Sequence, residues 1–526
     1  MTISKPKTCG IVAAGHPKTA EAGREMLLLG GNAFDAAIAA ILASFAVEPT
    51  LTSAGGGGFL LARTEAGENI LFDFFTQTPR QKRPLEAVDF YEVDVNFGDA
   101  VQPFHIGLGA IAVPGNVAGI FAVHQQLGRL PFGIIAEPAI AYAKQGVKIS
   151  PFQGFCISEL LVPILLALPE SRKIYAPSDR LLQAGEMLYN PDFANTLAAL
   201  VEQGPDLFYR GEIARQLVKD SKEKGGYLTL EDLQSYRVIR RDPLAIDYRG
   251  RKMLTNPPPS SGGALIAFAL KLLEAVDFQE MEFGSDLHLQ ILSRAMCLTN
   301  EARKDGYDAK IYQDNIAAEF LSDCHVGQYR DRTRGILNKW GSTTHVSVMD
   351  EEGNAATATT SNGEGSSYVI PGTGIMLNNM LGEADLNPSG FHQWPCDRRI
   401  SSMMAPTLVL KDDRPEIVLG SGGSNRIRTA ILQVLSNLID FGFSIEEAIA
   451  SPRIHWENGL FSIEPPYCEE RLNSIDFPAG TQIHCWREKN MFFGGVHGVR
   501  KTAAGKMEGA GDLRRGGAVA MSDHNI

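Results

Sequence analysis

Apolar residues recur at helical spacing over several long stretches of the chain. Between residues 18 and 46, alanines, leucines and methionines fall on one helical face, and Gly30-Gly31-Asn32 predicts a break between two helices. The same spacing predicts further helices within residues 115–235, 264–273 and 286–305. Residues 321–342 lack this periodicity and carry many charges, so we expect an irregular, exposed linker there.

A period of two replaces the helical period after residue 343. Thr344, Val346 and Val348 alternate with other positions as they would in a strand. A turn signal, Glu352-Gly353-Asn354, separates this run from a second β-rich run over residues 355–361. The pattern therefore predicts a β-hairpin that begins at Thr343-Thr344.

A second predicted hairpin leads into a glycine-rich loop. Its strands cover residues 407–410 and 416–419, and the second strand runs into Gly420-Ser421-Gly422-Gly423-Ser424. Apolar residues from Ile427 to Ile439 then return to helical spacing. A strand, a glycine turn and a helix therefore follow one another over residues 416–440.

The paired hydroxyl residues at the start of the first hairpin are the best candidates for a nucleophile. A hydroxyl is a weak nucleophile unless a base lies beside it. If the bond between Ser342 and Thr343 were cut, Thr343 would carry its own hydroxyl and a free α-amine, whose unperturbed pKa is near ~7.7–8. One residue would then supply both nucleophile and general base. His345, two positions on, fits a proton shuttle or a packed strand histidine equally well.

Three other segments carry groups suited to binding charged ligands. The glycines at 420–423 leave backbone N–H groups accessible beside a helix N-terminus, which suits an oxyanion hole, a carboxylate site, a phosphate site or only a structural turn. Ser401 and Ser402 can hold a carboxylate through their hydroxyls, or cap a loop. The carboxylates within residues 378–385 can bind a substrate ammonium or lie in solvent.

Composition and charge narrow the function classes. The 49 basic and 61 acidic residues give a net charge of −12, which disfavours binding to nucleic acid or to an anionic membrane. Seven cysteines without a Cys-x-x-Cys pair suit a reducing compartment. We expect no metal site and no cofactor, since no His/Cys cluster has ligand spacing. The N-terminus lacks the apolar run of a signal peptide, so we expect a cytoplasmic protein.

Taken together and in this order, these motifs resemble those of the γ-glutamyltransferases (γ-glutamyltranspeptidases), which are N-terminal-nucleophile hydrolases. The resemblance rests on Thr343-Thr344-His345-x-Ser347-Val348-x-Asp350, Asn378-Asn379, Ser401-Ser402-Met403 and Gly420-Ser421-x-Gly423-Ser424. It implies an α+β fold, a four-layer αββα sandwich. It also implies a precursor that cuts itself before Thr343. Residues 1–342 would form the large subunit and residues 343–526 the small subunit of one folded unit.

The resemblance further implies a catalytic cycle. Thr343 Oγ would first attack the carbonyl of Ser342, and water would resolve the resulting ester. The freed Thr343 would then attack a γ-glutamyl amide, while backbone N–H groups of Gly422 and Gly423 stabilise the oxyanion. Water or an amine would finally accept the acyl group. Whether the processed enzyme is a monomer or a homodimer is left open.

The resemblance also assigns a substrate pocket, and the chain departs from the family there. Residues expected to contact the substrate are Ser361, Glu383, Ser401 and Ser402. Phe75 occupies the position of the arginine that clamps the substrate carboxylate in typical members. Gly363 and Met380 stand at the pocket positions where the family has Asn and Gln or Glu. Losing a bidentate arginine is not a conservative change, so selectivity for γ-glutamyl groups is open.

Three hypotheses follow from the sequence. The first is a self-processing γ-glutamyltransferase or hydrolase acting on glutathione-like compounds. The second is an amidase or acylase of the same fold for another acyl group, such as a glutaryl or β-lactam side chain, and it is motivated by Phe75 and Met380. The third is an uncleaved binding protein that uses the same pocket without turnover.

Overall fold

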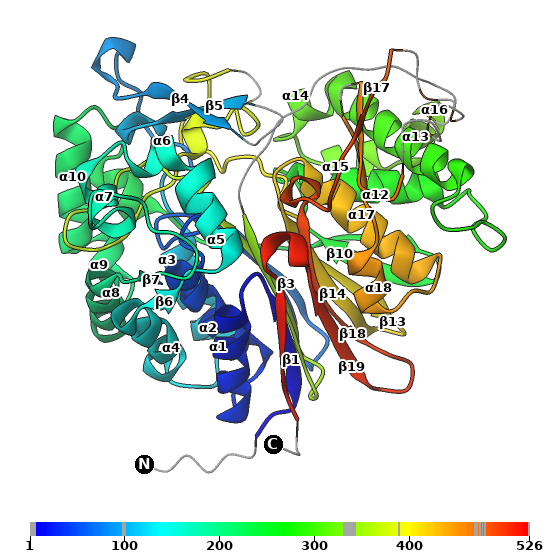
Figure 1. The fold of residues 1–526 in the computed structure, drawn as a ribbon, viewed down its shortest axis with the longest axis horizontal. Helices are drawn as coiled ribbons and strands as arrows, with labels where there is room; N and C mark the ends of the chain where they lie inside the picture. Colours follow the sequence, from blue (N-terminus) through cyan, green and yellow to red (C-terminus); the bar gives the residue numbers. More distant parts are fainter. Residues whose placement is uncertain are drawn as a thin grey trace.

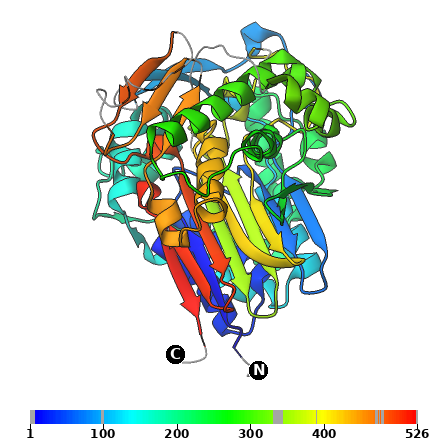
Figure 2. The same ribbon diagram turned by 90° about the vertical axis from the view of Figure 1, so that its right-hand side faces the viewer.

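Two β-sheets lie face to face, and helices cover both outer sides, so the protein is a four-layer αββα sandwich (Figure 1). The computed structural model describes residues 7–96, 101–329, 343–387, 390–457, 459–467, 472, 475, 477 and 480–523. This architecture confirms the expected α+β class. Figure 2, turned by 90°, shows the strands of the second sheet side by side beneath their helices.

The first sheet has the predicted nucleophile strand at its centre. In the described part of the chain it has seven strands in the order β20-β1-β11-β12-β2-β3-β8, and all neighbours are antiparallel. The strands are β1 (Gly10–Ala14), β2 (Gly57–Arg63), β3 (Asn69–Phe74), β8 (Ile239–Arg241), β11 (Thr344–Asp350), β12 (Ala355–Ser361) and β20 (Ala518–Ser522). The predicted hairpin is confirmed, because β11 pairs with β12 in the register Thr344↔Thr360.

The second sheet contains the predicted glycine-loop hairpin. Its six described strands run in the order β19-β18-β14-β13-β10-β9. They are β9 (Leu244–Tyr248), β10 (Arg251–Thr255), β13 (Thr407–Lys411), β14 (Arg414–Gly422), β18 (Gly495–Lys501) and β19 (Met507–Gly511). The β13–β14 hairpin is confirmed, and β14 reaches three residues further than expected, through Gly422.

Helices from the N-terminal half cover the first sheet, and helices from the later parts of the chain cover the second. The first group is α1 (Pro17–Leu28), α2 (Ala33–Val47), α3 (Asn116–Leu127), α4 (Phe132–Gln145) and α8 (Pro191–Gln203). The second group is α12 (Ser261–Leu273), α13 (Asp286–Ala302), α17 (Arg426–Ile439) and α18 (Ile445–Ala450). The break expected near residue 30 is confirmed: Gly30 has φ +80°, and Asn32 caps α2 in a box with Asp35.

The remaining helices and strands of the described chain are the following. The helices are α5 (Pro151–Phe155), α6 (Val162–Leu165), α7 (Pro169–Tyr175), α9 (Asp206–Tyr209), α10 (Glu212–Glu223), α11 (Leu230–Ser235), α14 (Asp308–Lys310), α15 (Ile316–Phe320) and α16 (Asp323–Tyr329). The strands are β4 (Tyr91–Asn96), β5 (Val101–Ile106), β6 (Val147–Lys148), β7 (Met187–Leu188), β15 (Ile454–Glu457), β16 (Leu460–Ile463) and β17 (Gln482–Cys485). The expectation of an irregular segment from residue 321 is wrong over α16, and its remainder, 330–342, lies outside the described residues.

Alternation along the central strands divides the core into two layers. Ile11 and Ala13 of β1 pack into the layer between the sheets, while Val12 and Ala14 face the helices α1 and α2. The same alternation in β11 sends Val346 and Val348 toward those helices. Odd-numbered positions of β11 therefore face the second sheet, and the side chain of residue 343 lies on the same side.

Candidate functional site

Thr343 lies at the end of the central strand β11, pressed against the end of β14. The residue is 5% exposed. A Cβ added to Gly422 would lie 2.1 Å from the Thr343 carbonyl oxygen and 2.9 Å from its carbonyl carbon. Only glycine allows this approach, because the atoms it would displace belong to backbone. The sequence-predicted pair of strand end and glycine loop is thus brought together across the two sheets.

The glycine loop continues from this contact into α17. Gly423 has φ +122°, a backbone conformation that side-chain-bearing residues rarely adopt, and Arg426 begins the helix three residues later. A backbone N–H beside the nucleophile, close to a helix N-terminus, is suited to stabilising a developing negative charge. Gly422 lies against the Thr343 backbone, and the oxyanion role of Gly422 and Gly423 stays a prediction.

A small cavity of about 30 Å³ opens beside Thr343. It brings together most of the residues that the sequence predicted for the site. Its lining includes Phe75, Thr343, Ser361, Met380, Glu383, Asp385, Leu386, Ser402, Met403, Met404, Ser424 and Ile427. The volume corresponds to about two or three water molecules, at about 10–15 Å³ for one water. Apolar and sulfur-bearing side chains form half of this lining.

Phe75 gives the small cavity an apolar wall in place of a guanidinium. Its side chain is buried and stacks on Phe59 with ring centroids 5.4 Å apart. Its backbone carbonyl accepts hydrogen bonds from Tyr236 and from the buried Arg399. Arg399 also forms an ion pair with Asp73 at 3.3 Å. Its guanidinium is therefore held behind Phe75 and does not face the cavity.

Glu383 is a buried carboxyl group at the edge of the small cavity. Its Oε1 has no hydrogen-bond partner among the described residues. Burial, together with the nearby Glu364, raises the pKa of Glu383 well above its ordinary value. Gly363 makes room for it, because a Cβ there would lie 2.0 Å from Oε1. The buried site therefore favours the neutral, protonated form of Glu383 over the carboxylate.

His345 is a packed strand histidine, which resolves the alternative left open by the sequence. Its ring lies between the two sheets, with Nδ1 2.8 Å from Thr359 Oγ1 and Nε2 2.9 Å from Ser347 Oγ. Complete burial lowers its pKa well below the ordinary value, so the ring is neutral. Gly420 lies against the ring, since a Cβ there would approach within 2.3 Å. The side chain does not line the cavity beside Thr343.

Glu48 is a buried group near the nucleophile that sequence reasoning missed. It follows the last residue of α2 and accepts hydrogen bonds from the hydroxyls of Thr344 and Thr19, each at 2.6 Å. Burial raises its pKa to about 7, although both hydroxyls act in the opposite direction. The only signal in the sequence was a charged residue directly after a helix that is mainly apolar beyond Asp35. The carboxyl anchors the residue next to Thr343.

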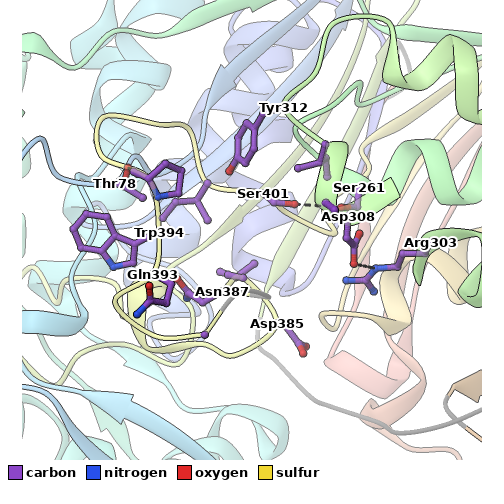
Figure 3. A pocket seen from close by; sticks show the side chains of 16 residues that line it. Thr78, Ser261, Arg303, Asp308, Tyr312, Asp385, Asn387, Gln393, Trp394 and Ser401 are labelled. Atoms are coloured by element: carbon purple, nitrogen blue, oxygen red, sulfur yellow. Dashed lines mark hydrogen bonds and ion pairs between the residues drawn. The ribbon is translucent and has the colours of Figure 1, made fainter. Parts of the chain in front are cut away.

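A second, larger cavity of about 260 Å³ adjoins the small one (Figure 3). The two cavities share Asp385 and Leu386 as lining residues. Ser401 lines the larger cavity and not the small one, and its hydroxyl lies 3.2 Å from that of Ser261. Ser401 and Ser402 are adjacent in sequence but line different cavities.

The wall of the larger cavity carries charged and aromatic groups from distant segments. Arg303 donates to Asp308 at 2.8 Å. Figure 3 shows this pair on the side opposite Trp394, with Tyr312 above Ser401. None of Arg303, Tyr312 and Trp394 was predicted as a site residue, because each lies in a segment that the chain pattern marks only as helix or loop.

Two further properties concern cofactors and membranes. Among the residues that the structure describes, no three His, Cys, Asp or Glu side chains are grouped so that they could hold a metal ion. Within the same residues, every helix is too short or too polar to cross a bilayer.

Comparisons with known proteins identify relatives in sequence and in fold. The Escherichia coli (strain K12) glutathione hydrolase proenzyme is 31% identical over 89% of this chain and 84% of its own length. An acylase ACY 1 proenzyme from Pseudomonas sp. (strain SE83) is 31% identical over 86% of this chain and 84% of its own. A crystal structure of cephalosporin acylase from Bacillus halodurans superimposes with a TM-score of 0.85 at 26% identity, covering 98% of this chain and 96% of the other. The gamma-glutamyltranspeptidase family model matches residues 19–522, and the chain therefore belongs to the gamma-glutamyltranspeptidase family.

Proposed function

We propose that this protein is a self-processing N-terminal threonine amidohydrolase. The observation that carries the proposal is the position of Thr343, at the start of a central strand, against the Gly422 backbone and beside a cavity. Cleavage before Thr343 would divide the chain into residues 1–342 and 343–526. The family membership and the proenzyme names of the relatives support such processing.

Processing and turnover use the same atoms. In processing, Thr343 Oγ attacks the carbonyl carbon of Ser342, the C–N bond breaks, and the nitrogen leaves as the α-amine of Thr343. Water then hydrolyses the ester. In turnover, that amine takes the proton from Thr343 Oγ as the oxygen attacks a substrate amide, and it delivers the proton to the leaving amine. Gly422 and Gly423 N–H groups stabilise the oxyanion, and water releases the acyl group as an acid.

The acyl group favoured by the geometry has no α-amino-acid head group. Phe75, Met380 and the methionines 403 and 404 present apolar surface to Thr343, and no arginine or lysine is among the described residues lining that small cavity. Burial raises the pKa of Glu383, which disfavours the charged carboxylate that a substrate ammonium would need. The acylase relatives support this choice of substrate class.

A γ-glutamyl amide is the second candidate. Ser361, Glu383 and Ser402 all line the small cavity, so hydroxyls and a carboxyl group are present for a polar acyl group. The glutathione hydrolase relatives favour this reading.

The two candidates differ in a direct assay. Purified, processed protein is offered butyryl-, glutaryl- and γ-glutamyl-p-nitroanilide, and kcat/KM is measured for each. An acylase hydrolyses the first or second at least tenfold better than the third, and a γ-glutamyl enzyme shows the reverse order. Binding without turnover of any of the three, in fully processed or unprocessed protein, contradicts both and leaves the binding-protein hypothesis.

A further inference from the structure

A third hollow, of about 470 Å³, continues the line of cavities that begins at Thr343. It shares Ile311 and Tyr312 with the larger cavity, which in turn shares Asp385 and Leu386 with the small one. We call it the arginine hollow; its charged lining residues are Arg80, Arg237, Arg241, Asp314, Asp397, Arg398 and Arg399.

One segment of the chain passes all three spaces in order. Arg398 and Arg399 line the arginine hollow, Ile400 and Ser401 line the larger cavity, and residues 402–404 line the small cavity beside Thr343. The three spaces are therefore neighbours along a single strip of backbone. A ligand with its reactive carbonyl at Thr343 and an extended chain can follow this strip toward the arginines.

The arginine hollow has an excess of positive charge in a protein that is otherwise acidic. Five arginines and two aspartates line it, while the whole chain carries a net charge of −12. Arg241 and Arg399 pair with Asp73, and Arg80 pairs with Asp397 at 3.1 Å. A hollow with an excess of one sign of charge attracts and orients a ligand of the other sign.

Two of the arginines are not neutralised by a carboxylate within the described part of the chain. Arg237 is exposed, and its Nη1 donates to the backbone carbonyls of Gln234 and Tyr236, each at 2.7 Å, which leaves its positive charge uncompensated. Arg398 is exposed as well. Neither guanidinium forms an ion pair with a carboxylate in the described part of the chain. A guanidinium binds a carboxylate through two parallel hydrogen bonds, so this pair is suited to a carboxylate ligand.

We propose that the arginine hollow is a remote carboxylate subsite, which holds an anionic end of the substrate at a distance from the amide that Thr343 cleaves. The inference rests on the proposed amidohydrolase function. It differs from a carboxylate clamp beside the nucleophile, because Phe75 closes that position and Arg399 is directed behind it. The carboxylate belongs either to the far end of the acyl group or to the departing amine, and these two sources are separated by experiment.

The test compares matched substrates on the wild-type protein and on an Arg237→Gln/Arg398→Gln variant. The acyl arm uses glutaryl- against butyryl-p-nitroanilide, and the amine arm uses the butyryl amide of 4-aminobenzoate against butyranilide. For each pair we take the ratio of kcat/KM for the charged substrate to that for the neutral one. We expect this ratio to fall at least tenfold in one arm, and that arm identifies which part of the substrate carries the carboxylate. A change below twofold in both arms overturns the proposal.

Controls separate the subsite from folding and from the proposed function. Arg215→Gln, an exposed arginine on α10 away from the three spaces, should leave both ratios unchanged. Glutarate binding to the wild-type protein and to the double variant is measured in parallel by calorimetry. If no substrate is turned over, the proposed function fails, yet a tenfold weaker glutarate affinity in the double variant still supports the subsite. Equal affinity in the two proteins, or no binding at all, overturns it.

Discussion

Replacing Gly422 with alanine tests whether the glycine loop holds the nucleophile in place. The new Cβ would lie 2.1 Å from the Thr343 carbonyl oxygen, whereas ordinary contacts begin near 3.4 Å. The Thr343 atoms that it meets belong to the backbone and cannot rotate away, so the strands must separate by about 1 Å at this point. A displacement of about 1 Å between reacting groups can reduce the rate about 100-fold, and overpacking of a core costs about 1–3 kcal/mol of stability.

The assay follows both processing and turnover. Gly422→Ala protein is purified, its processing is timed on denaturing gels, and kcat/KM for the best p-nitroanilide substrate is measured on the processed fraction. We expect processing to slow markedly and kcat/KM to fall about 100-fold, with a lowered midpoint of thermal unfolding. The fall should lie in kcat more than in KM, because the substrate pocket itself is unchanged.

A matched glycine provides the control. In Gly133→Ala the added Cβ meets only a Val201 methyl group, at 3.3 Å, far from the site on α4. This variant should process and turn over as the wild type does. If Gly422→Ala folds, processes at the wild-type rate and keeps kcat/KM within threefold, the backbone contact has no role in placing Thr343.

Three further predictions follow from the site. Thr343→Ala should remain a single chain without amidase activity, and any processing of this variant in pure protein contradicts self-cleavage by Thr343. Glu48 has a pKa raised to about 7, so its contribution to stability is present below pH 4.5 and is lost as the pH rises through 7. At about 1.4 kcal/mol per pH unit, the loss in free energy of unfolding is about 3 kcal/mol. Urea unfolding at several pH values should show that Glu48→Gln lacks this part of the pH dependence. Identical pH profiles for the wild type and the variant would contradict this role of Glu48. Glu383→Gln should keep kcat/KM for butyryl-p-nitroanilide within threefold at pH 7, since the raised pKa of Glu383 favours its neutral form, which a glutamine resembles. A loss above 30-fold would show that the charge of Glu383 is required.

The sequence predicted those parts of the site that depend on local pattern. The period-two run after Thr343 predicted β11 and β12, and the cluster of glycines before an apolar helix predicted the loop at the end of β14. These features are visible because alternation, turn residues and glycine runs act over a few neighbouring positions. That these two features lie together across the two sheets was predicted from the family resemblance and not from the pattern.

The parts that could not be predicted depend on long-range packing. Glu48 follows a helix nearly 300 residues before Thr344, and nothing local indicates that it becomes buried beside that hydroxyl. The arginine hollow draws Arg80, Arg237 and Arg398 from three separate segments. In the sequence, Arg398-Arg399 is a short basic run typical of a solvated loop or an ion pair. In the fold Arg399 pairs with the buried Asp73, while Arg398 remains at the surface.

The burial of His345 has the same origin. Its place in β11 was predictable, because strand alternation fixes which face each residue takes. Its role was not, since the face could border either a solvent-filled cleft or a packed layer. The second sheet, with Gly420 against the imidazole ring, decides between them.

The central claim is that activity requires a new N-terminus at Thr343, and intact-mass measurement on protein of proven amidase activity tests it most directly. The account predicts two polypeptides whose masses correspond to residues 1–342 and 343–526. Activity that co-purifies with a full-length polypeptide alone, or with a cut at any other bond, contradicts it.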